Sequence, residues 1–349
     1  MNDQNRNAVS SEDRIASARR AGEAYSRALQ DVYRTIAAIK KDKSIEPAAR
    51  KRILQGLYAR LSWKDIKISF NEDVIPYRVG VSFRSSISHT RLVKAELKKQ
   101  GLSIARGGNP KLRDREFARA LGVPTPRTIM DSVALSEIVV QPNTVIKPVS
   151  GSSARGVFLV SSDLKATSVY SGNVYETFEE GVRKEFGDKD RSWIVETMVG
   201  TYEQPAHDLK VFAFYGEPVL LEEIRRNVGE EAKNLFCFYL PDGEKTIVDR
   251  KREMFDGQGF PRQVLEYATL ISKNTPAPFV RVDFLCAGND VMLGEITPHP
   301  GGTYHGQLFE RIDKMLGEKF LEAEGRLAAD LLRGKDFNLY LETYSSEGQ

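Results

Sequence analysis

The sequence predicts an α+β protein with a helical extension at its N-terminus. Three observations favour this class: a heptad-spaced helical pattern near the start, a series of short β-type runs from about residue 144 onward, and helical segments between those runs. With 349 residues, 41% hydrophobic and 28% charged, the chain can bury a core in two lobes or two to three subdomains. Disordered and fibrous classes are therefore excluded.

Charge is unevenly distributed along the chain. The net charge is only +3, so the total does not point to a nucleic-acid binder and we expect no nucleic-acid partner. The first 110 residues, however, carry 22 Lys and Arg against 11 Asp and Glu, and the remainder is acidic. This basic part could be a stabilising or dimerising appendage, or it could engage an acidic substrate or an anionic membrane surface.

The composition also indicates a compartment. Cys237 and Cys286 are too few for a disulfide framework, and each lies in an apolar run typical of a buried strand. The N-terminus has no apolar stretch of the signal-peptide type, and no run of about 18 uncharged apolar residues occurs anywhere. We expect a soluble, cytoplasmic protein without a membrane span.

The first 63 residues are expected to form a disordered leader, 1–10, and a helical hairpin. From Ser11, apolar and small residues repeat in two heptad-spaced series, typical of a narrow helical seam: Ile15, Gly22, Leu29 and Ile36, and Ala18, Tyr25, Val32 and Ile39. A second helix would run from Pro47 to about Trp63. Its inward residues are expected to be Ile53, Leu57 and Leu61. The seam permits a homodimer or packing within the chain.

The remaining pattern mixes helices and short strands. Residues 64–86 look strand-rich and irregular. Helices are expected at 89–100, 111–121, 174–186, 261–274 and 317–333, the last closed by Gly334. Strands are expected at 102–105, 144–149, 156–161, 192–197, 209–215, 218–223, 279–285 and 291–297.

The most informative segment is a predicted hairpin with a three-residue loop at 288–290. This loop would place Asp283 opposite Glu295 and Arg281 opposite Thr297, on one face of the hairpin. The other face would carry Val280, Val282, Phe284, Met292 and Ile296. Opposed carboxylates repel, and oxygen ligands without His or Cys favour Mg²⁺ or Mn²⁺ between them. The alternative is a pair of solvated charges, since a one-residue slip would separate them.

A second candidate feature is a strand followed by a loop of small residues. Lys147 interrupts an apolar strand pattern, where a cation needs an anionic partner. Backbone amides of the loop after it could bind phosphate oxygens: Gly151, Ser152 and Ser153. Neither a P-loop nor a dinucleotide-binding glycine motif is present. An ordinary hairpin loop remains the alternative.

Taken in order, these segments resemble the ATP-grasp superfamily, and residues 208–317 look most like its TupA-like group. The motifs that carry the resemblance are Lys111, Lys147 with its loop, the strand end at Glu196, Asp208-Leu-Lys210, Arg281-Val-Asp283 and Gly294-Glu-Ile-Thr297. The segment that begins at Lys111 also looks like the helix that supplies a nucleotide-binding lysine in D-alanine-D-alanine ligases. The resemblance covers about residues 100–330.

The resemblance implies an ATP-grasp fold, in which two α+β subdomains clamp ATP. The helical hairpin lies outside it as an N-terminal extension. We therefore expect five parts: the leader and hairpin (1–63), a pre-ATP-grasp region (64–110), the lid and central subdomain (111–200), a C-terminal metal-binding and catalytic subdomain (201–335) and a tail (336–349).

Carried over position by position, the resemblance also implies a nucleotide site. Lys111 and Lys147 would contact ATP phosphates, with the loop of Gly151, Ser152 and Ser153 closing over them. Glu196 would line the adenine or ribose pocket, with Asp208 nearby. Lys210 would lie at the phosphate or substrate end.

The implied catalytic groups follow in the C-terminal part. Asp283 and Glu295 would hold Mg²⁺, with Mn²⁺ possible, and Thr297 stands where many members of the superfamily place Asn. Arg281 would steady the transferring phosphoryl group, and the amides of Gly301 and Gly302 would form an oxyanion site. Three further residues could bind substrate: His299, His305 and Arg225. The histidines could equally pack, and Arg225 with Arg226 could be a solvated surface pair.

The reaction that the resemblance implies is an ATP-dependent, ADP-forming carboxylate-amine ligation through an acyl phosphate. Its partners would be a small-molecule carboxylate and an amine. TupA-like proteins are associated with amino-acid-bearing cell-surface polymers, so an amino acid or an acidic sugar is the expected substrate class. Two alternatives stay open: an ATP-grasp kinase acting on a small molecule or polymer, and an ATP-binding regulatory protein without turnover.

Overall fold

The computed structural model describes residues 11–58, 61, 81–100, 110–149, 154–187, 191–225, 234–249, 252–298 and 308–345. The chain divides into two compact units, Met1–Val81 and Ser82–Gln349. The division lies further along the chain than residue 63, where we expected the helical hairpin to end. Each unit has a hydrophobic core of its own.

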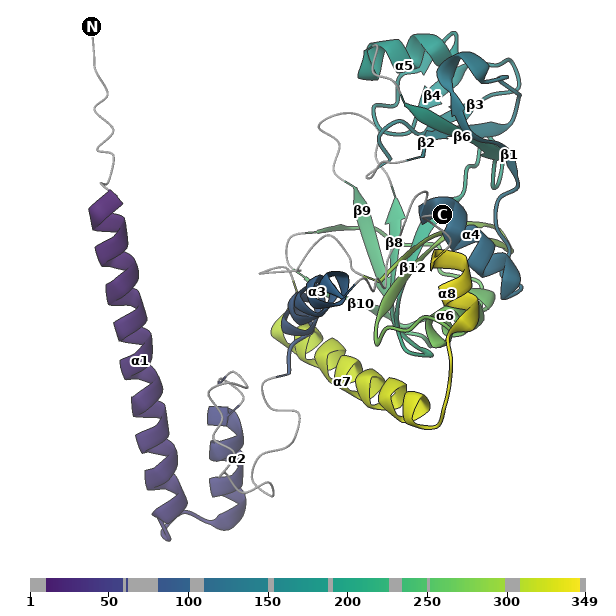
Figure 1. Ribbon diagram of the computed structural model, residues 1–349. Helices are drawn as coiled ribbons and strands as arrows, with labels where there is room; N and C mark the ends of the chain where they lie inside the picture. Colours follow the sequence, from purple (N-terminus) through teal and green to yellow (C-terminus); the bar gives the residue numbers. More distant parts are fainter. Residues whose placement is uncertain are drawn as a thin grey trace, which may run out of the picture. The chain divides into compact units, whose positions relative to one another are not determined.

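The first unit is the predicted hairpin of two helices, α1 (Ser11–Lys41) and α2 (Pro47–Tyr58) (Figure 1). α2 begins directly after Glu46. The carboxylate of Glu46 accepts hydrogen bonds from two backbone N–H groups of the first turn, at 2.9 and 3.0 Å. These groups have no partner within a helix, so the side chain fixes where α2 starts.

The hairpin core lies where the two helices meet. Ile36 of α1 is buried there with Leu54 and Tyr58 of α2 and with Leu61. Ile53, which we expected to point inward, is instead 43% exposed. Leu54 and Tyr58, four residues apart, form the inward stripe of α2 in its place.

The α1 seam is only partly covered. Its second half, from Leu29 onward, packs against α2. In its first half, Ile15 is 64% exposed and Tyr25 is 54% exposed. The reason is length, because α2 has 12 residues and α1 has 31.

The second unit contains two antiparallel-paired sheets (Figure 1). The first sheet has the order β1-β6-β2-β3-β4-β5. Its strands are β1 (Thr128–Ala134), β2 (Thr144–Pro148), β3 (Phe158–Val160), β4 (Ala166–Ser168), β5 (Val174–Tyr175) and β6 (Ser192–Thr197). A short 3₁₀ turn, η2 (Leu135–Glu137), follows β1. The helix α5 (Phe178–Phe186) packs on this sheet through Phe178 and Val182.

The second sheet has the order β10-β9-β8-β7-β12-β13, and β11 joins β9 in parallel. Its strands are β7 (His207–Phe214), β8 (Glu217–Arg225), β9 (Leu235–Tyr239), β10 (Lys245–Thr246), β11 (Glu253–Met254), β12 (Val280–Ala287) and β13 (Asp290–Thr297). Helices α6 (Gln263–Lys273) and α7 (Glu310–Leu332) bury their apolar sides in the same core as β7, β8 and β12.

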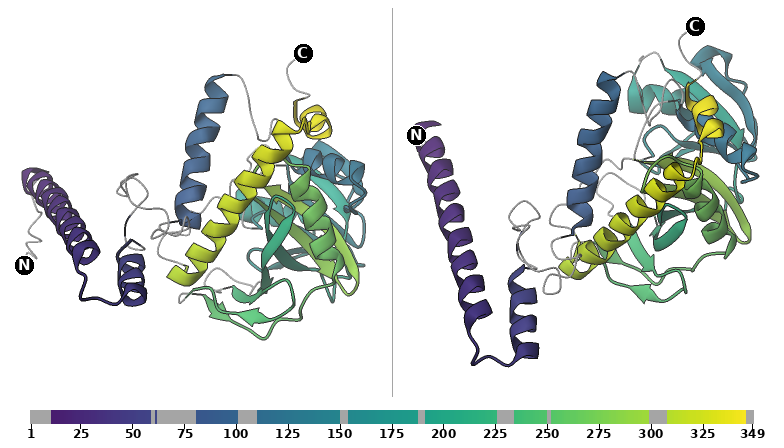
Figure 2. Two further views of the ribbon diagram at one scale, coloured as in Figure 1. Left: turned by 90° about the horizontal axis from the view of Figure 1, so that it is seen from below. Right: turned by 60° about the horizontal axis from the view of Figure 1, so that its bottom comes forward.

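The described part of the second unit contains three more helices: α3 (Phe83–Lys99), α4 (Pro110–Ala120) and α8 (Asn338–Ser345). α3 lies beside the first turns of α7 (Figure 2). Asp313 of α7 accepts hydrogen bonds from the hydroxyl of Ser82 at 2.6 Å and the backbone N–H of Arg84 at 3.0 Å. The expected irregular segment up to 86 is therefore wrong for its last residues, because this contact starts a helix at Phe83.

Other elements differ in extent from the sequence prediction. α7 begins at Glu310 rather than at 317, and α5 begins only at Phe178 because β5 takes up the start of the segment that we expected to be helical. Residues 338–345, which we placed in a tail, form α8. The expected strand at 102–105 and residues 64–80 lie outside the described part. Among the helices described, none is both long and apolar enough to cross a membrane.

Candidate functional site

The polar face of the β12–β13 hairpin has the predicted register. Asp283 lies opposite Glu295, and Arg281 lies opposite Thr297. On the other side of β12, Asp283 lies opposite Lys210 of β7. Side chains of directly opposed residues share a sheet face, so both carboxylates and both cations project from one surface.

The register arises in a different way from the one predicted. The loop has two residues, because Ala287 already pairs with Asp290, and Gly288 has the positive φ of 58° that such loops favour at their first position. That loop alone would pair Asp283 with Gly294 and turn Glu295 to the apolar face. A β-bulge between Leu293 and Glu295 inserts one extra residue and restores the pairing.

The two-residue turn also overturns one expectation. Met292 was expected on the apolar face of the hairpin. It lies instead opposite Leu285, on the same face as Asp283, and Leu293 is buried opposite Phe284 in its place. The four other expected members of the apolar face are buried: Val280, Val282, Phe284 and Ile296.

Asp283 is the electrostatic centre of this face. It is 9% exposed, and its carboxylate accepts hydrogen bonds from Nε and Nη2 of Arg281 at 2.7 and 2.8 Å and from Nζ of Lys210. Burial by itself would raise the pKa of Asp283, but Lys210 and Arg281 outweigh it and hold the pKa below its usual range. The group is therefore a carboxylate at neutral pH.

The donors of this face fit a hard divalent cation. The hydroxyl of Thr297 lies 3.4 Å from a carboxylate oxygen of Glu295, so the edge of the hairpin presents oxygen atoms from three residues. In the described residues, no cluster of three or more His, Cys, Asp or Glu side chains forms a closed metal cage. Two carboxylates with room for water and phosphate are what Mg²⁺ usually takes.

The charged row extends further than the sequence prediction. Glu222 of β8 lies opposite Lys210 and is 5% exposed. Its carboxylate pairs with Arg252, which also contacts Asp249 at 3.1 Å. Arg252 lies over the ring of Phe236 at 4.8 Å. Sequence analysis missed this cluster because its members come from separate segments, although a charge at position 222 within the apolar pattern of β8 was a signal.

The first sheet contributes a second buried ion cluster. Lys147 of β2 and Glu196 of β6 lie on one face, with Lys147 Nζ 2.5 Å from a carboxylate oxygen of Glu196. Arg115 of α4, which is fully buried, pairs with the other oxygen of that carboxylate. Burial would raise the pKa of Glu196, but Lys147 and Arg115 lower it below its usual range. Glu196 is 2% exposed, and its carboxylate holds both cations.

Lys111 interacts electrostatically with charged residues of both sheets: Lys147 and Glu196 of the first sheet and Glu295 of the second. Its Nζ donates to the carbonyl of Pro148 at 3.3 Å, next to Lys147. Burial and the charge of Lys147 lower the pKa of Lys111 to about 8, against the opposing effect of Glu295 and Glu196. Burial likewise lowers the pKa of Lys147. A concentrated, partly desolvated positive charge suits the binding of phosphate.

Of two other predicted residues, the structure places Asp208 on the charged face and Arg225 on the opposite one. Asp208 lies two positions from Lys210 on β7, opposite Leu285, so it shares the face of Asp283. Arg225 is exposed at the end of β8, three positions from Glu222. With regular pairing between them, alternation turns Arg225 to the opposite face, and the structure does not bring it to the site.

Several predicted residues lie outside the described part of the chain. They are the loop residues Gly151, Ser152 and Ser153, together with Arg226, His299, Gly301, Gly302 and His305.

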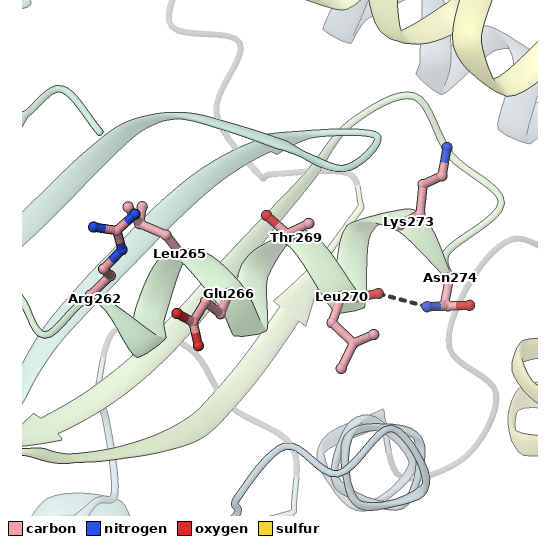
Figure 3. A pocket seen from close by; sticks show the side chains of 7 residues that line it. All are labelled: Arg262, Leu265, Glu266, Thr269, Leu270, Lys273 and Asn274. Carbon is pink, nitrogen blue, oxygen red and sulfur yellow. Dashed lines mark hydrogen bonds between the residues drawn. The ribbon is translucent and has the colours of Figure 1, made fainter. Parts of the chain in front are cut away.

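Two surface hollows lie away from these clusters. One follows the outer side of α6, lined by Arg262, Leu265, Glu266, Thr269, Leu270, Lys273 and Asn274 (Figure 3). The other lies beside Lys273 and α7. α6 packs its inner side against the apolar core, and the charged row occupies the face opposite to that core. These hollows therefore do not belong to the charged site.

Two sheets, one with the buried Lys147 and the other with the carboxylates of Asp283 and Glu295, are the arrangement that the resemblance to ATP-grasp proteins implies. The match of this chain to a family model covers residues 122–321. The chain belongs to the TupA-like ATPgrasp family.

Solved structures with a similar arrangement have low identity to this chain. The D-alanine–D-alanine ligase of Bacillus anthracis, described as complexed with ATP, has 16% identity and a TM-score of 0.41, with 70% of this chain and 76% of that chain covered. The enzyme of Helicobacter pylori has 17% identity and a TM-score of 0.34, covering 62% and 60%. The ATP-grasp ligase PsnB, complexed with minimal precursor, Mg and ADP, has 12% identity and a TM-score of 0.37, with 68% of this chain and 67% of that chain covered. No curated protein matches in sequence.

Proposed function

We propose that the protein is an ATP-dependent, ADP-forming carboxylate-amine ligase. The observation that carries the proposal is the pairing of Asp283 with Glu295 on one sheet face, beside Lys210 and Arg281. Carboxylates next to cations suit a nucleoside triphosphate and its divalent ion, because phosphoryl transfer needs positioning and charge neutralisation. Membership of the ATPgrasp family supports the same function.

The nucleotide would lie against the cations of the first sheet. Lys111 and Lys147 would bind phosphate oxygens, with the amides of Gly151, Ser152 and Ser153 closing over them. Glu196 would act by holding Lys147 in place, which its buried ion pair supports. Asp208 would line the nucleotide pocket from the second sheet.

The divalent ion would be held by Asp283, Glu295 and Thr297, with Mg²⁺ preferred over Mn²⁺. When bound, it would neutralise charge on the phosphate groups during transfer. Lys210 and Arg281 both pair with Asp283 and balance its charge. Both side chains would turn toward phosphate or substrate oxygens when the ion is held by Asp283.

The proposed reaction has two steps. A carboxylate oxygen of the acid bonds to the γ-phosphorus of ATP while the bond to the ADP oxygen breaks. An amine then attacks the carbonyl carbon of the acyl phosphate, inorganic phosphate leaves with the bonding electrons, and the amine loses a proton to give the amide. Arg281, Lys210 and the amides of Gly301 and Gly302 would stabilise the negative charge in both steps.

The proposed substrates are an amino acid or an acidic sugar, including the precursor of a cell-surface polymer. His299 and His305 would bind one of them, and Arg225 would bind a second carboxylate only if a substrate reaches the end of β8. We place the reaction in the cytoplasm, where ATP is supplied. The exposed half of the α1 seam supports a homodimer through the first unit.

The reaction is tested by trapping the acyl phosphate. Purified protein is mixed with Mg-ATP, hydroxylamine and a panel of amino acids and sugar acids, and hydroxamate and ADP are measured. A ligase gives both products in equal amounts. A stable phosphorylated product would identify a kinase instead, and tight ATP binding without ADP would identify a regulatory protein.

Glu295→Gln tests the residue assignment in the same assay. Because the amide is a poor metal ligand, we expect turnover to be abolished while thermal unfolding stays near that of the wild type. Asp290→Asn is the matched control, since Asp290 is an exposed carboxylate on the same strand. Near-normal turnover in Glu295→Gln would remove Glu295 from the metal site.

A further inference from the structure

A buried carboxylate on α4 contacts the strand that carries Glu295. Asp114 is 1% exposed, and one of its oxygens accepts the backbone N–H of Ile296 at 2.9 Å. The other oxygen accepts the hydroxyl of Tyr344, in α8, at 2.6 Å. A hydrogen bond to a buried charge is stronger than one between neutral groups, so this contact is a firm tie between α4 and β13.

The hydrogen bond from Ile296 to Asp114 lies next to the β-bulge of β13. Among the described strands β13 is the last of its sheet, so none of them pairs with its outward backbone groups. Two of these groups are satisfied by the segment around α4: Leu293 donates to the carbonyl of Pro124 at 2.8 Å, and Ile296 donates to Asp114. These two contacts lie on either side of the bulge that sets the register of Glu295.

Ile296 stands between the two predicted metal ligands of β13. Its side chain is buried in the core, so those of Glu295 and Thr297 turn to the opposite, charged face. Holding the Ile296 N–H therefore fixes the direction of both neighbours. The same helix carries Lys111 three residues earlier and Arg115 directly after Asp114, so α4 joins the phosphate-binding cations to the metal-binding edge.

α8 is itself well fixed on α4. The ring of Tyr344 lies 5.9 Å from that of Phe117, and the ring of Tyr340 lies 5.3 Å from it in an edge contact. Arg113 also donates to the carbonyl of Thr343 at 3.1 Å. The hydroxyl of Tyr344 is therefore held where it can orient the carboxylate of Asp114.

We propose that Asp114, oriented by Tyr344, is a positioning residue for the metal site, which it serves by fixing the direction of Glu295 and Thr297. The inference rests on the proposed function, since it assumes that these residues hold a divalent ion. Asp114 does not touch the ion. Loss of such an outer contact typically weakens metal affinity by about 10- to 100-fold.

The chain offers a matched control elsewhere in the same unit. Asp313 is 5% exposed and also accepts one backbone N–H, from Arg84, and one hydroxyl, from Ser82, at 3.0 and 2.6 Å. It differs from Asp114 in that the guanidinium Nε of Arg84 also lies 3.3 Å from its carboxylate. It fastens α3 to α7 and has no contact with β13 among its described partners. Replacing Asp313 therefore removes a carboxylate of the same kind without touching the metal edge.

The experiment measures Mn²⁺ binding by the full chain through the enhancement of water proton relaxation. Mn²⁺ is titrated alone and then with a non-hydrolysable ATP analogue. We expect Asp114→Ala to weaken Mn²⁺ binding about 10-fold or more. Asp114→Asn, whose amide oxygen can still accept the Ile296 N–H, should bind within about threefold of the wild type, and Asp313→Ala should bind like the wild type although it is destabilised.

A second pair of variants tests the proposal if Asp114→Ala does not fold. Tyr344→Phe removes only the hydroxyl that orients Asp114, and Ser82→Ala removes the corresponding hydroxyl at Asp313. Weaker Mn²⁺ binding in Tyr344→Phe but not in Ser82→Ala supports the proposal. Equal Mn²⁺ affinity in the wild type, Asp114→Ala and Tyr344→Phe overturns the proposal. It is also overturned if the controls Asp313→Ala and Ser82→Ala lose as much Mn²⁺ affinity as Asp114→Ala and Tyr344→Phe. A wild-type chain that binds no Mn²⁺ under either condition overturns the proposed function as well.

Discussion

Lys111 is a cation held where burial opposes its charge. Its pKa is lowered to about 8, first by burial and then by Lys147. Because its pKa in the folded chain lies below the unfolded value, the protonated lysine costs folding free energy at pH values below about 8. That cost falls as the pH rises from about 8 toward the unfolded value, so the contribution of Lys111 to stability increases across this window.

A nucleotide bound at Lys111 should reverse this shift. Phosphate oxygens favour the protonated lysine, so we expect binding of an ATP analogue at pH 8.5 to take up a proton, approaching about one per site. The measurement is isothermal calorimetry in buffers of different ionisation enthalpy. The same titration at pH 6.5 should show no uptake, because Lys111 is already charged there.

Lys111→Arg is the control for this prediction. Arginine stays protonated throughout, so the variant should bind the analogue without proton uptake at pH 8.5. Undiminished uptake in Lys111→Arg would assign the proton to another group, such as Lys147, whose pKa is also lowered by burial, and the prediction for Lys111 would be wrong.

The carboxylate pair could be predicted from sequence, whereas its supporting residues could not. Alternation and turn position are local, so Asp283 and Glu295 follow from a short segment. Arg115 has its partner Glu196 at a separation of 81 residues. In the sequence it is one of several charges on a polar helix. Asp114 and Arg115 do share the buried side of α4 with Phe117, and this interruption of an apolar stripe was the available signal.

At the scale of elements, long periodic segments were predictable and short ones were not. α1, β2, β6 and the β12–β13 hairpin agree with their patterns. β10 and β11 have two residues each, too few for any periodicity, and form by pairing with β9. The start of α3 combines a local signal with a distant one. Ser82 is an N-cap that accepts the backbone N–H of Ser85, and Asp313, more than 200 residues away, accepts the N–H of Arg84.

The packing of α3 on α7 depends on a glycine. A Cβ at position 317 would lie 2.8 Å from the backbone N of Ser82 and 2.9 Å from that of Phe83. We therefore expect Gly317→Ala to destabilise the second unit by about 1 to 3 kcal/mol through overpacking. The free energy of unfolding is measured in urea.

Gly325 provides the comparison within the same helix. Nothing lies within 4 Å of a Cβ built there, so Gly325→Ala should stabilise the chain by about 0.5 to 1 kcal/mol through helix propensity. If both alanine variants changed stability by the same amount and sign, the close approach of α3 to Gly317 would be refuted.

At the scale of the whole molecule, the basic part of the sequence and the first unit overlap without coinciding. Residues 82–110 are also basic but belong to the second unit, and the core of the first unit is a small cluster around Ile36 and Tyr58. The second unit contains both sheets and the candidate site. The charge balance along the sequence changes near residue 110 and does not mark this division. Its position required the structure, because residues 64–81 carry no clear periodic pattern.

The exposed half of the α1 seam leads to a prediction about assembly. We expect the chain to form a dimer at micromolar concentration, with Ile15 buried between two copies of α1. Burial of one isoleucine contributes roughly 1.5 to 3 kcal/mol, so Ile15→Glu should shift the chain to the monomer. Light scattering coupled to size exclusion measures the mass.

Ile53→Glu is the control for assembly. Ile53 is an exposed isoleucine in the same hairpin but outside the seam, so the dimer should persist. A monomeric wild-type chain, or dissociation by both variants alike, would exclude α1 as the interface.

The extra residue in β13 also determines how the hairpin responds to changes at its tip. The bulge at Gly294 separates the turn from the carboxylate edge. If one residue were removed from the turn, Gly294 could enter the ladder and residues 291–293 would exchange faces, yet Glu295 would still lie opposite Asp283. The bulge can therefore compensate for the loss of one residue at the tip without changing the pairing of the two carboxylates.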